Sequence, residues 1–225
     1  MGLAPNYIRR CDLEMIIAVD GPAAAGKGTL AKLLAKHYAL AWLETGSLYR
    51  AVALKMLRNG DDPEDPESAA NAVKLLKPTD LHDPELRSED VGEAASKVAA
   101  IPSVRVALIG FQRAFANKPP GDAQGAVLDG RDIGTVVCPD ADYKVYVTAT
   151  PEARAHRRFL ELRDKGETVD AQTVLVATRE RDARDTERAT SPLKPATDAY
   201  LLDTTNLSID AAFAALKTYI SGSSD

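Results

Sequence analysis

The sequence predicts a three-layer α/β fold, in which a five-stranded parallel sheet carries helices on both faces. Short segments rich in apolar and β-branched residues alternate with longer segments of helical spacing, which is typical of a parallel sheet. Most positions in the short segments are apolar, as expected for strands buried on both sides. The five expected strands are Met15–Asp20, Ala41–Leu43, Ala126–Asp129, Tyr143–Val147 and Tyr200–Asp203.

The segments between these strands carry apolar residues three and four positions apart, the spacing of one helix face. Leu30, Leu33 and Leu34 share such a face, and Asn59-Gly60 supplies the end of the next helix. The expected helices are Lys27–His37, Ser47–Arg58, Glu89–Ala100 and Ser103–Ala116, with two more that begin near Pro151 and Ile209.

The composition describes a folded chain. Its 225 residues are 45% hydrophobic and 27% charged, so the chain can bury a core without disulfides or a structural metal. With 33 acidic and 28 basic residues, the net charge is −5. Non-specific nucleic-acid binding rests on lysine and arginine paired with phosphate, so we expect no nucleic-acid polymer as a partner. Any phosphate group must be held at a local site.

The cysteines and the length of the apolar stretches indicate in which cellular compartment the protein is expected. Cys11 and Cys138 are far apart and belong to no CxxC pair, so we expect reduced thiols and a cytoplasmic protein. No stretch approaches 18 apolar residues, so no membrane partner is expected. Residues 1–14 lack the order of a secretory signal and are expected to form a polar N-terminal extension. No exposed apolar stripe stands out, and we expect a monomer.

The composition also divides residues 15–225. Between Asp61 and Glu93, eleven acidic residues stand against three basic ones, and four prolines interrupt the pattern; this favours a solvated acidic face or a loosely packed insert. From Ala153 to Arg188 the pattern is helical and carries eight arginines. We expect a core of residues 15–60, 101–152 and 189–225, an insert of residues 61–100, and an arginine-rich lid of residues 153–188.

A phosphate-binding loop follows the first strand. The segment Gly21–Thr29, GPAAAGKGT, fits the pattern G-x-x-x-x-G-K and leads into a helix. Glycines let the backbone turn tightly and point its N–H groups inward, and the helix start adds positive potential. Lys27 supplies a mobile cation for the β- and γ-phosphates. The loop predicts a P-loop NTPase-type fold with a site for the phosphates of a nucleotide.

One position departs from the strict motif. Gly28 stands where a serine or threonine would contact Mg²⁺, so we expect Mg²⁺ to be held by the ATP phosphates, with Thr29 as the residue left to contact the metal or a phosphate. The form Gly-Lys-Gly-Thr is found in nucleoside monophosphate kinases. A GTPase would need Asn-Lys-x-Asp, but Asn117 is followed by Lys-Pro-Pro. A hydrolytic ATPase would need an Asp-Glu pair at a strand end, where this chain has Asp129-Gly-Arg-Asp132.

Longer blocks narrow the class further. They are Glu44–Arg50 (ETGSLYR), Leu128–Val137 (LDGRDIGTVV), Ala155–Arg158 (AHRR), Arg179–Asp185 (RERDARD) and Leu202–Thr205 (LDTT). Together with the phosphate loop, they resemble bacterial-type cytidylate kinases, a family of nucleoside monophosphate kinases. The resemblance runs from about Met15 to the C-terminus. It implies transfer of the γ-phosphoryl group of Mg²⁺-ATP to CMP and dCMP, with the insert binding the nucleoside; the insert is shorter than in many members.

The resemblance implies roles for individual residues. The ATP-binding set is Gly21, Pro22, Ala23, Ala24, Ala25, Gly26, Lys27, Gly28 and Thr29, with Arg157 and Arg158 in the lid. The phosphate of CMP would be held by Thr45, Tyr49, Arg50, Arg131 and Arg188. Cytosine would be read by Ser96, Arg105 and Asp132. The CMP-binding set also includes Asp129, and Arg181 and Asp185 for the sugar or a bridge to phosphate. The expected catalytic residues are Lys27, Arg131, Arg181 and Arg188.

Elementary chemistry supports these roles. Two polyanions must approach each other, and planar arginine forks screen that repulsion while staying charged. Charge in the transition state lies on the equatorial oxygens, so arginine and Mg²⁺ suffice and no general base is needed. His37, His82 and His156 accordingly show no triad-like setting. Cytosine offers an amino donor to a carboxylate and ring acceptors to an arginine, which suits Asp132 and Arg105.

Simpler alternatives stay open at this stage. Asp132 could merely pair with a neighbouring arginine, Arg105 could lie on a helix surface, and Arg157 could pair with Glu161 four residues on. Cys138, which follows a strand, is expected to pack as a small hydrophobe. Two rival functions remain: a kinase for UMP or AMP on the same fold, and a regulatory module that binds ATP without transfer. A sensor needs only one phosphate site, so a second arginine cluster argues against the latter.

Overall fold

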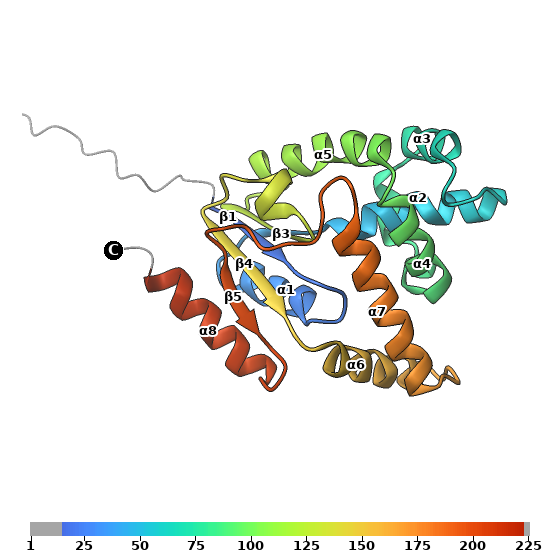
Figure 1. Ribbon diagram of the computed structural model, residues 1–225. Helices are drawn as coiled ribbons and strands as arrows, with labels where there is room; N and C mark the ends of the chain where they lie inside the picture. Colours follow the sequence, from blue (N-terminus) through green and yellow to red (C-terminus); the bar gives the residue numbers. More distant parts are fainter. Residues whose placement is uncertain (1–14, 223–225) are drawn as a thin grey trace, which may run out of the picture.

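One parallel sheet forms the centre of the protein (Figure 1). The computed structural model describes residues 15–222; the expected extension of residues 1–14 and Cys11 lie outside the described residues. The strands are β1 (Met15–Asp20), β2 (Ala41–Glu44), β3 (Gly125–Gly130), β4 (Tyr143–Thr148) and β5 (Tyr200–Asp203). They pair in the order β2-β3-β1-β4-β5, all parallel, which confirms the expected sheet.

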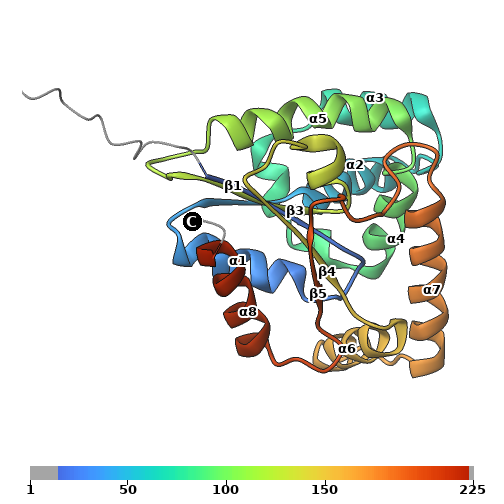
Figure 2. The same ribbon diagram turned by 60° about the vertical axis from the view of Figure 1, so that its left-hand side comes forward.

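Helices cover both faces of the sheet. Helices α1 (Lys27–His37) and α8 (Ile209–Gly222) lie on one face, and α5 (Pro102–Asn117) lies on the other (Figure 2). Leu34 and Leu216 pack with Val19 and Val145 on the first side, and Ala116 packs with Leu128 on the second. Burying apolar side chains on both sides is what makes the strands apolar nearly throughout.

A helical cluster adjoins one end of the sheet. It contains α2 (Thr45–Asn59), α3 (Pro66–Lys74) and α4 (Glu89–Val98), which share a core with α5, and two 3₁₀ turns, Pro78–His82 and Pro84–Arg87. Helix α2 begins two residues before the expected start, because β2 runs directly into it and the hydroxyl of Ser47 donates to the carbonyl of Glu44 rather than capping the helix.

The acidic segment is more ordered than its composition indicates. Asp65 caps α3 by accepting from the backbone N–H groups of Glu67 and Ser68, and Pro66 occupies the first helical position. Ala69 and Ala72 of this helix are buried against the cluster. The acidic residues therefore begin and solvate a packed element, and the expectation of a loosely packed insert is wrong over α3.

Two helical arms, α6 (Pro151–Asp164) and α7 (Ala171–Glu187), extend away from the sheet and meet at a wide angle (Figure 1). Thr150 caps α6, and Asp170 caps α7. Leu162 and Val174 belong to the apolar part of the contact between the two helices. These helices cover most of the expected arginine-rich lid. The division into core, insert and lid stays a prediction.

The strand register sets the position of the site. Asp20 at the end of β1 is paired with Gly130, and Glu44 at the end of β2 is paired with Asp129. The carboxyl ends of three neighbouring strands therefore deliver polar groups to one edge of the sheet, where open α/β folds hold their ligands.

One further finding concerns long apolar helices. Within residues 15–222, no single helix has the length and apolar content to cross a membrane. Only α4 and α5 taken together are long and apolar enough, and the chain bends by 100° where they join.

Candidate active site

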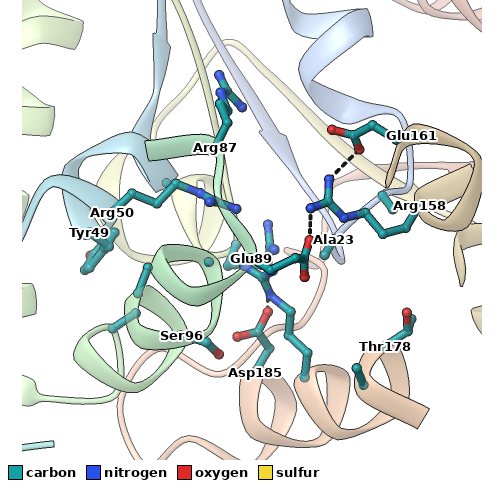
Figure 3. Close-up of a pocket in the computed structure, with 18 of the residues that line it drawn as sticks. Ala23, Tyr49, Arg50, Arg87, Glu89, Ser96, Arg158, Glu161, Thr178 and Asp185 are labelled. Atoms are coloured by element: carbon teal, nitrogen blue, oxygen red, sulfur yellow. Dashed lines mark hydrogen bonds and ion pairs between the residues drawn. The ribbon is translucent and has the colours of Figure 1, made fainter. Parts of the chain in front are cut away.

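A cavity of about 700 Å³ opens at this edge, between the phosphate loop, the helical cluster and the two arms (Figure 3). Its wall brings together most of the expected site residues: Ala23, Ala24, Lys27, Thr45, Tyr49, Arg50, Ser96, Arg105, Asp129, Arg131, Asp132, Arg158, Arg181, Asp185 and Arg188. The other expected residues lie outside its wall: Gly21, Pro22, Ala25, Gly26, Gly28, Thr29 and Arg157.

The phosphate loop presents Lys27 to the cavity. Gly26 has a φ of 89°, and α1 begins at the next residue, so Lys27 stands on the first helical turn. Burial, reinforced by the positive charge of Arg131, lowers the pKa of Lys27 to about 7, although the carboxylates of Asp129 and Glu44 act in the opposite direction. An anion bound in the cavity would raise the pKa of Lys27 again, because a negative charge stabilises the ammonium form of this side chain.

Two arginines pair with a single carboxylate opposite the loop, and a third, Arg181, adds its charge nearby. Arg131 Nε donates to Asp185 Oδ2 at 2.8 Å, and Arg188 Nη2 lies 3.5 Å from Asp185 Oδ1. Although burial acts to raise it, these charges hold the pKa of Asp185 below its usual range. Burial and the neighbouring Arg131 lower the pKa of Arg181 to about 10, and its Nε is buried without a hydrogen-bond partner among the described residues. Positive charge is in excess here.

Arg50 enters the cavity from α2 (Figure 3). Its Nη1 donates to the carbonyl of Leu86 at 2.6 Å, which joins α2 to the turn before α4. Gly92 of α4 leaves room for the guanidinium, because a Cβ there would lie 3.2 Å from both of its terminal nitrogens. A larger residue at this position would push Arg50 aside.

The far end of the cavity has a buried ion pair. Arg105 of α5 donates to Asp132, and both side chains are at most 7% exposed. Arg105 also donates to the carbonyl of Ala99 at 3.1 Å and lies over the ring of Tyr49, 5.5 Å from its centre. Nearby, Ser96 Oγ is buried without a hydrogen-bond partner among the described residues. Asp132 thus does pair with an arginine, and Arg105 is not a helix-surface residue.

Asp20 is a residue of this edge that the sequence did not single out for a role. Its two carboxylate oxygens accept from the backbone N–H groups of Ile133 and Gly134, at 2.8 and 2.7 Å. Burial raises the pKa of Asp20 to about 7, against the effect of these two hydrogen bonds. The contact holds the turn that follows Arg131 and Asp132. The sequence did contain a signal for this role, since Asp20 is an acidic residue at the end of an apolar strand.

Asp129 lies beside the phosphate loop. Its Oδ2 accepts from Trp42 Nε1 at 2.9 Å, and a Cβ on Gly28 would be 3.9 Å from the same oxygen. Burial raises its pKa, and the charge of Lys27 opposes this. Among residues 15–222, no group of three or more histidine, cysteine or acidic side chains could hold a metal ion alone.

Comparison with known proteins decides the family. The model of the family described as cytidylate kinase matches residues 17–221. The chain belongs to the cytidylate kinase family. It is 56% identical over 211 residues to the cytidylate kinase of Methylocella silvestris, covering 94% of this chain and 96% of that protein. It is also 56% identical over 203 residues to that of Paramagnetospirillum magneticum, covering 90% and 96%.

A solved structure agrees on the fold alone. An uncharacterised protein from Eubacterium ventriosum has a TM-score of 0.54 at 17% identity, covering 92% of this chain and 99% of that one. The expected family, kinase class and P-loop-type fold are confirmed. Membership of the cytidylate kinase family does not itself assign roles to residues, so the residue roles stay proposals.

The two expected lid arginines of this cytidylate kinase family member lie in different places. Arg158 faces the cavity between Glu89 of α4 and Glu161, with Nη1 2.7 Å from Glu161 Oε2 (Figure 3). Arg157 instead donates to the hydroxyl of Thr204 at 3.1 Å and to its carbonyl at 2.5 Å. That hydroxyl donates to the carbonyl of Ala25 at 2.9 Å, which places Arg157 behind the phosphate loop.

Some expected residues have no contact with the cavity. Thr29 is exposed on the first turn of α1. Cys138 is buried and its pKa is raised to about 11, mainly by burial, as expected for a cysteine that packs as a small hydrophobe. The reduced thiols and cytoplasmic location expected from the cysteines stay predictions.

Proposed function

We propose that this protein transfers the γ-phosphoryl group of Mg²⁺-ATP to the phosphate of CMP and of dCMP, forming the diphosphate and ADP. One observation carries the proposal: Lys27 on the phosphate loop and Arg50, Arg131 and Arg188 line a single cavity. Two anion sites that face each other are what transfer between phosphates requires, whereas a sensor of ATP needs one.

In this proposal the arginines do most of the catalysis. The oxygen of the CMP phosphate forms a bond to the γ-phosphorus as the bond to the β–γ bridging oxygen breaks, and that oxygen leaves with ADP. Lys27, Arg131, Arg181 and Arg188 stabilise the negative charge on the equatorial oxygens. A monophosphate has its second pKa at about 6, so the attacking oxygen is already ionised at neutral pH and needs no base.

Cytosine would be read at the Arg105–Asp132 pair. A carboxylate accepts from the 4-amino group, and a guanidinium donates to the ring acceptors. The unpartnered Oγ of Ser96 supplies a further polar group on the same wall. Uracil would turn a carbonyl oxygen toward Asp132, and an unmatched buried group of this kind discriminates strongly.

Asp129 fits the metal that accompanies ATP. Mg²⁺ is usually held by one or two carboxylates together with substrate phosphates. The Trp42 hydrogen bond holds one oxygen of Asp129 beside the loop, and Glu44 is a second carboxylate on the cavity wall. When bound, Mg²⁺ supplies positive charge that offsets the charge of the transferring group. Thr29, on an exposed surface, is a poorer candidate.

The helical cluster and the arms would act as the insert and the lid. Glu89 of α4 and Arg158 of α6 form an ion pair across the cavity mouth. Exclusion of water is needed because water competes with CMP for the γ-phosphoryl group. We propose that α6 and α7 close the cavity and that the protein acts as a monomer in the cytoplasm.

A coupled assay of ADP release with CMP, dCMP, UMP and AMP tests the proposal. We expect turnover to depend on the monophosphate and to be highest with the cytidine nucleotides. Asp132→Asn should lower the ratio of kcat/KM for CMP to that for UMP by about tenfold or more, because the neutral amide accepts less strongly from the 4-amino group of cytosine and can donate to the 4-carbonyl of uracil. Arg58→Gln, an exposed change outside the cavity, is the control. An unchanged ratio would remove Asp132 from base reading, and ATP binding without acceptor-dependent turnover would favour a regulatory module.

A further inference from the structure

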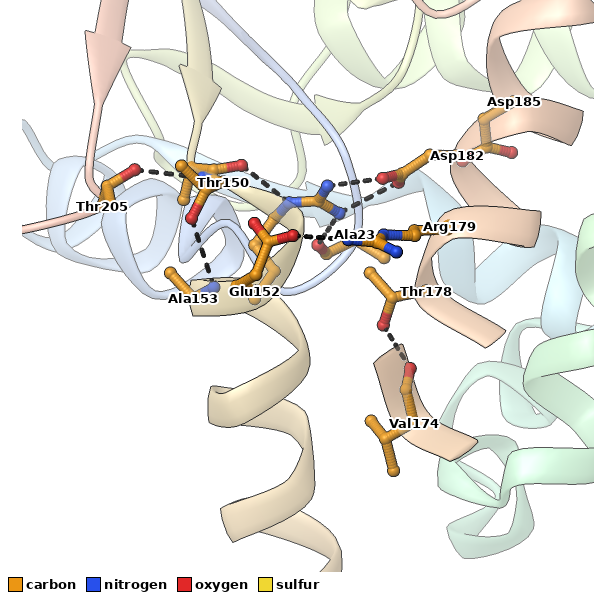
Figure 4. Close-up of polar contacts among 12 residues, drawn as sticks. Ala23, Thr150, Glu152, Ala153, Val174, Thr178, Arg179, Asp182, Asp185 and Thr205 are labelled. Atoms are coloured by element: carbon orange, nitrogen blue, oxygen red, sulfur yellow. Dashed lines mark hydrogen bonds and ion pairs between the residues drawn. The ribbon is translucent and has the colours of Figure 1, made fainter. Parts of the chain in front are cut away.

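A buried arginine at the start of α6 joins three separate parts of the molecule. Arg154 is 3% exposed. Its guanidinium donates from Nε to Ala149 O at 2.9 Å, from Nη1 to Ala23 O at 3.2 Å and to Asp182 Oδ1 at 2.9 Å, and from Nη2 to Asp182 Oδ2 at 2.5 Å. These oxygens belong to the segment after β4, the phosphate loop and α7 (Figure 4).

On the loop side, the contact orients a peptide that borders the cavity. Ala23 and Ala24 both line it, and Ala24 has a φ of 57°, in the left-handed region that residues other than glycine seldom adopt. Because C=O and N–H of one peptide point in opposite directions, a fixed carbonyl of Ala23 also fixes the N–H of Ala24. Phosphate loops bind through such N–H groups.

On the helix side, the contact fixes one turn of α7. Asp182 follows Arg181 and precedes Asp185 by three residues, and both of these line the cavity. Asp185 in turn accepts from Arg131 Nε at 2.8 Å. A continuous set of contacts therefore runs from the phosphate loop through Arg154 and the α7 turn to Arg131.

We propose that Arg154 and Asp182 are positioning residues that couple the phosphate loop to the α7 turn carrying Arg181 and Asp185. Nucleotide binding at the loop then favours binding of the acceptor, and by linkage the acceptor favours nucleotide binding to the same extent. The part of this proposal that concerns coupled binding of nucleotide and acceptor rests on the proposed function. The two-pronged pairing is specific to arginine, because an ammonium group cannot donate in the same fork geometry.

A matched control pair joins the same two helices. Arg179 Nη2 lies 2.7 Å from Glu152 Oε1, and these side chains are 57% and 59% exposed (Figure 4). Neither residue lines the cavity or contacts the phosphate loop in the described contacts. If α6 and α7 merely needed an ion pair to stay together, loss of either pair would have similar effects.

The first test needs no nucleotide. Hydrogen–deuterium exchange is followed in the ligand-free protein for Asp182→Asn and Arg179→Gln. We expect Asp182→Asn to speed exchange about threefold or more in amides of residues 23–28 as well as 181–185, and Arg179→Gln to leave the loop unchanged. Exchange that rises only in α7, or rises equally in both variants, would overturn the coupling.

The second test measures the coupling itself. CMP affinity is determined with and without a non-hydrolysable ATP analogue, and the ratio of the two affinities is compared between variants. We expect the ratio to exceed one in the wild type, to fall toward one in Asp182→Asn and to stay within about twofold of wild type in Arg179→Gln. A wild-type ratio of one, or a ratio untouched by Asp182→Asn, contradicts the proposal.

Two further comparisons complete the test of the coupling between the loop and α7. Arg154→Gln should give the same loss of coupling, and the double variant should be no worse than either single one, because both changes break one contact; Arg154→Gln replaces Asp182→Asn if the latter does not fold. If the wild type binds neither CMP nor the analogue, the proposed function fails, and the exchange experiment still decides whether the contact links loop and helix.

Discussion

Lys27 shows how strongly single residues of this site depend on their surroundings. Its ammonium group lies near Arg131 and Arg181 as well as Asp129 and Glu44, and burial has the largest effect on its pKa. Burial also has the largest effect on the pKa of Arg181, which it lowers. These charged side chains, which the proposed function assigns to phosphate, are therefore held in unfavourable surroundings when no anion is bound.

The lysine should make stability depend on pH. Its pKa is about 7 in the folded protein and 10.5 in an unfolded chain, so between these values the unfolded chain binds more protons. The contribution of Lys27 to the free energy of unfolding should therefore rise with pH from about 7 to about 10.5. We expect urea unfolding to show wild type gaining stability relative to Lys27→Met across this window.

Lys36→Met, which removes an exposed lysine from the same helix, is the control for this measurement. A constant difference between wild type and Lys27→Met from pH 7 to pH 10 would show that burial does not penalise the charge of Lys27. Activity should collapse in Lys27→Met at every pH, because the transferring group loses its nearest cation on the loop.

At the scale of elements, the start of the phosphate loop lies in close contact with strand β4. Gly21 has a φ of 147°, and a Cβ there would lie 2.0 Å from the carbonyl oxygen of Val147 at the end of β4. Gly26 also has a positive φ, of 89°, but a Cβ there would meet nothing within 4 Å. The two glycines are needed for different reasons.

These two glycines should therefore tolerate alanine differently. Gly26→Ala should cost about 1 kcal/mol of unfolding free energy, from backbone strain alone. Gly21→Ala should cost about 3 kcal/mol or more, because strain adds to an overlap that only movement of a strand can relieve. Denaturant unfolding measures both, and equal losses would mean that the close approach to β4 is easily relaxed.

At the scale of the whole molecule, charge is distributed unevenly. The net charge is −5, yet Arg50, Arg131, Arg181 and Arg188 line one cavity with Lys27. Repulsion among these groups is partly offset by Asp185. An anion that binds the folded protein and not the unfolded chain must stabilise the whole domain.

Sulfate should therefore raise the melting temperature more than chloride at equal ionic strength. At about ten times its dissociation constant, one bound anion adds about 1.4 kcal/mol, or about 3 °C for a chain of this size. Arg131→Gln should reduce this shift, whereas Arg58→Gln, an exposed change outside the cavity, should keep it. A sulfate shift no larger than that of chloride would indicate that the cavity holds no anion.

The extent of sequence prediction follows the range of the interactions. The strands, most helices and the phosphate loop follow from apolar spacing and turn residues, which are local. Helix α3 was missed because its prolines and acidic residues read as a solvated segment, although Asp65 and Pro66 form a good helix start. The roles of Asp20 and Arg154 were missed because the contacts that define them are distant in sequence: Asp20 accepts from Ile133, 113 residues away, and Arg154 donates to Ala23, 131 residues away.

By itself, the sequence determined the fold class, the nucleotide loop and the family, since these depend on short patterns whose physics is local. Only the tertiary structure decided which arginines share the cavity, that Arg157 lies behind the loop while Arg158 faces Glu89, and that Arg154 joins the loop to α7. Neighbouring arginines of one helix cannot be told apart in the sequence, because their burial and their hydrogen-bond partners are set only when distant segments pack together.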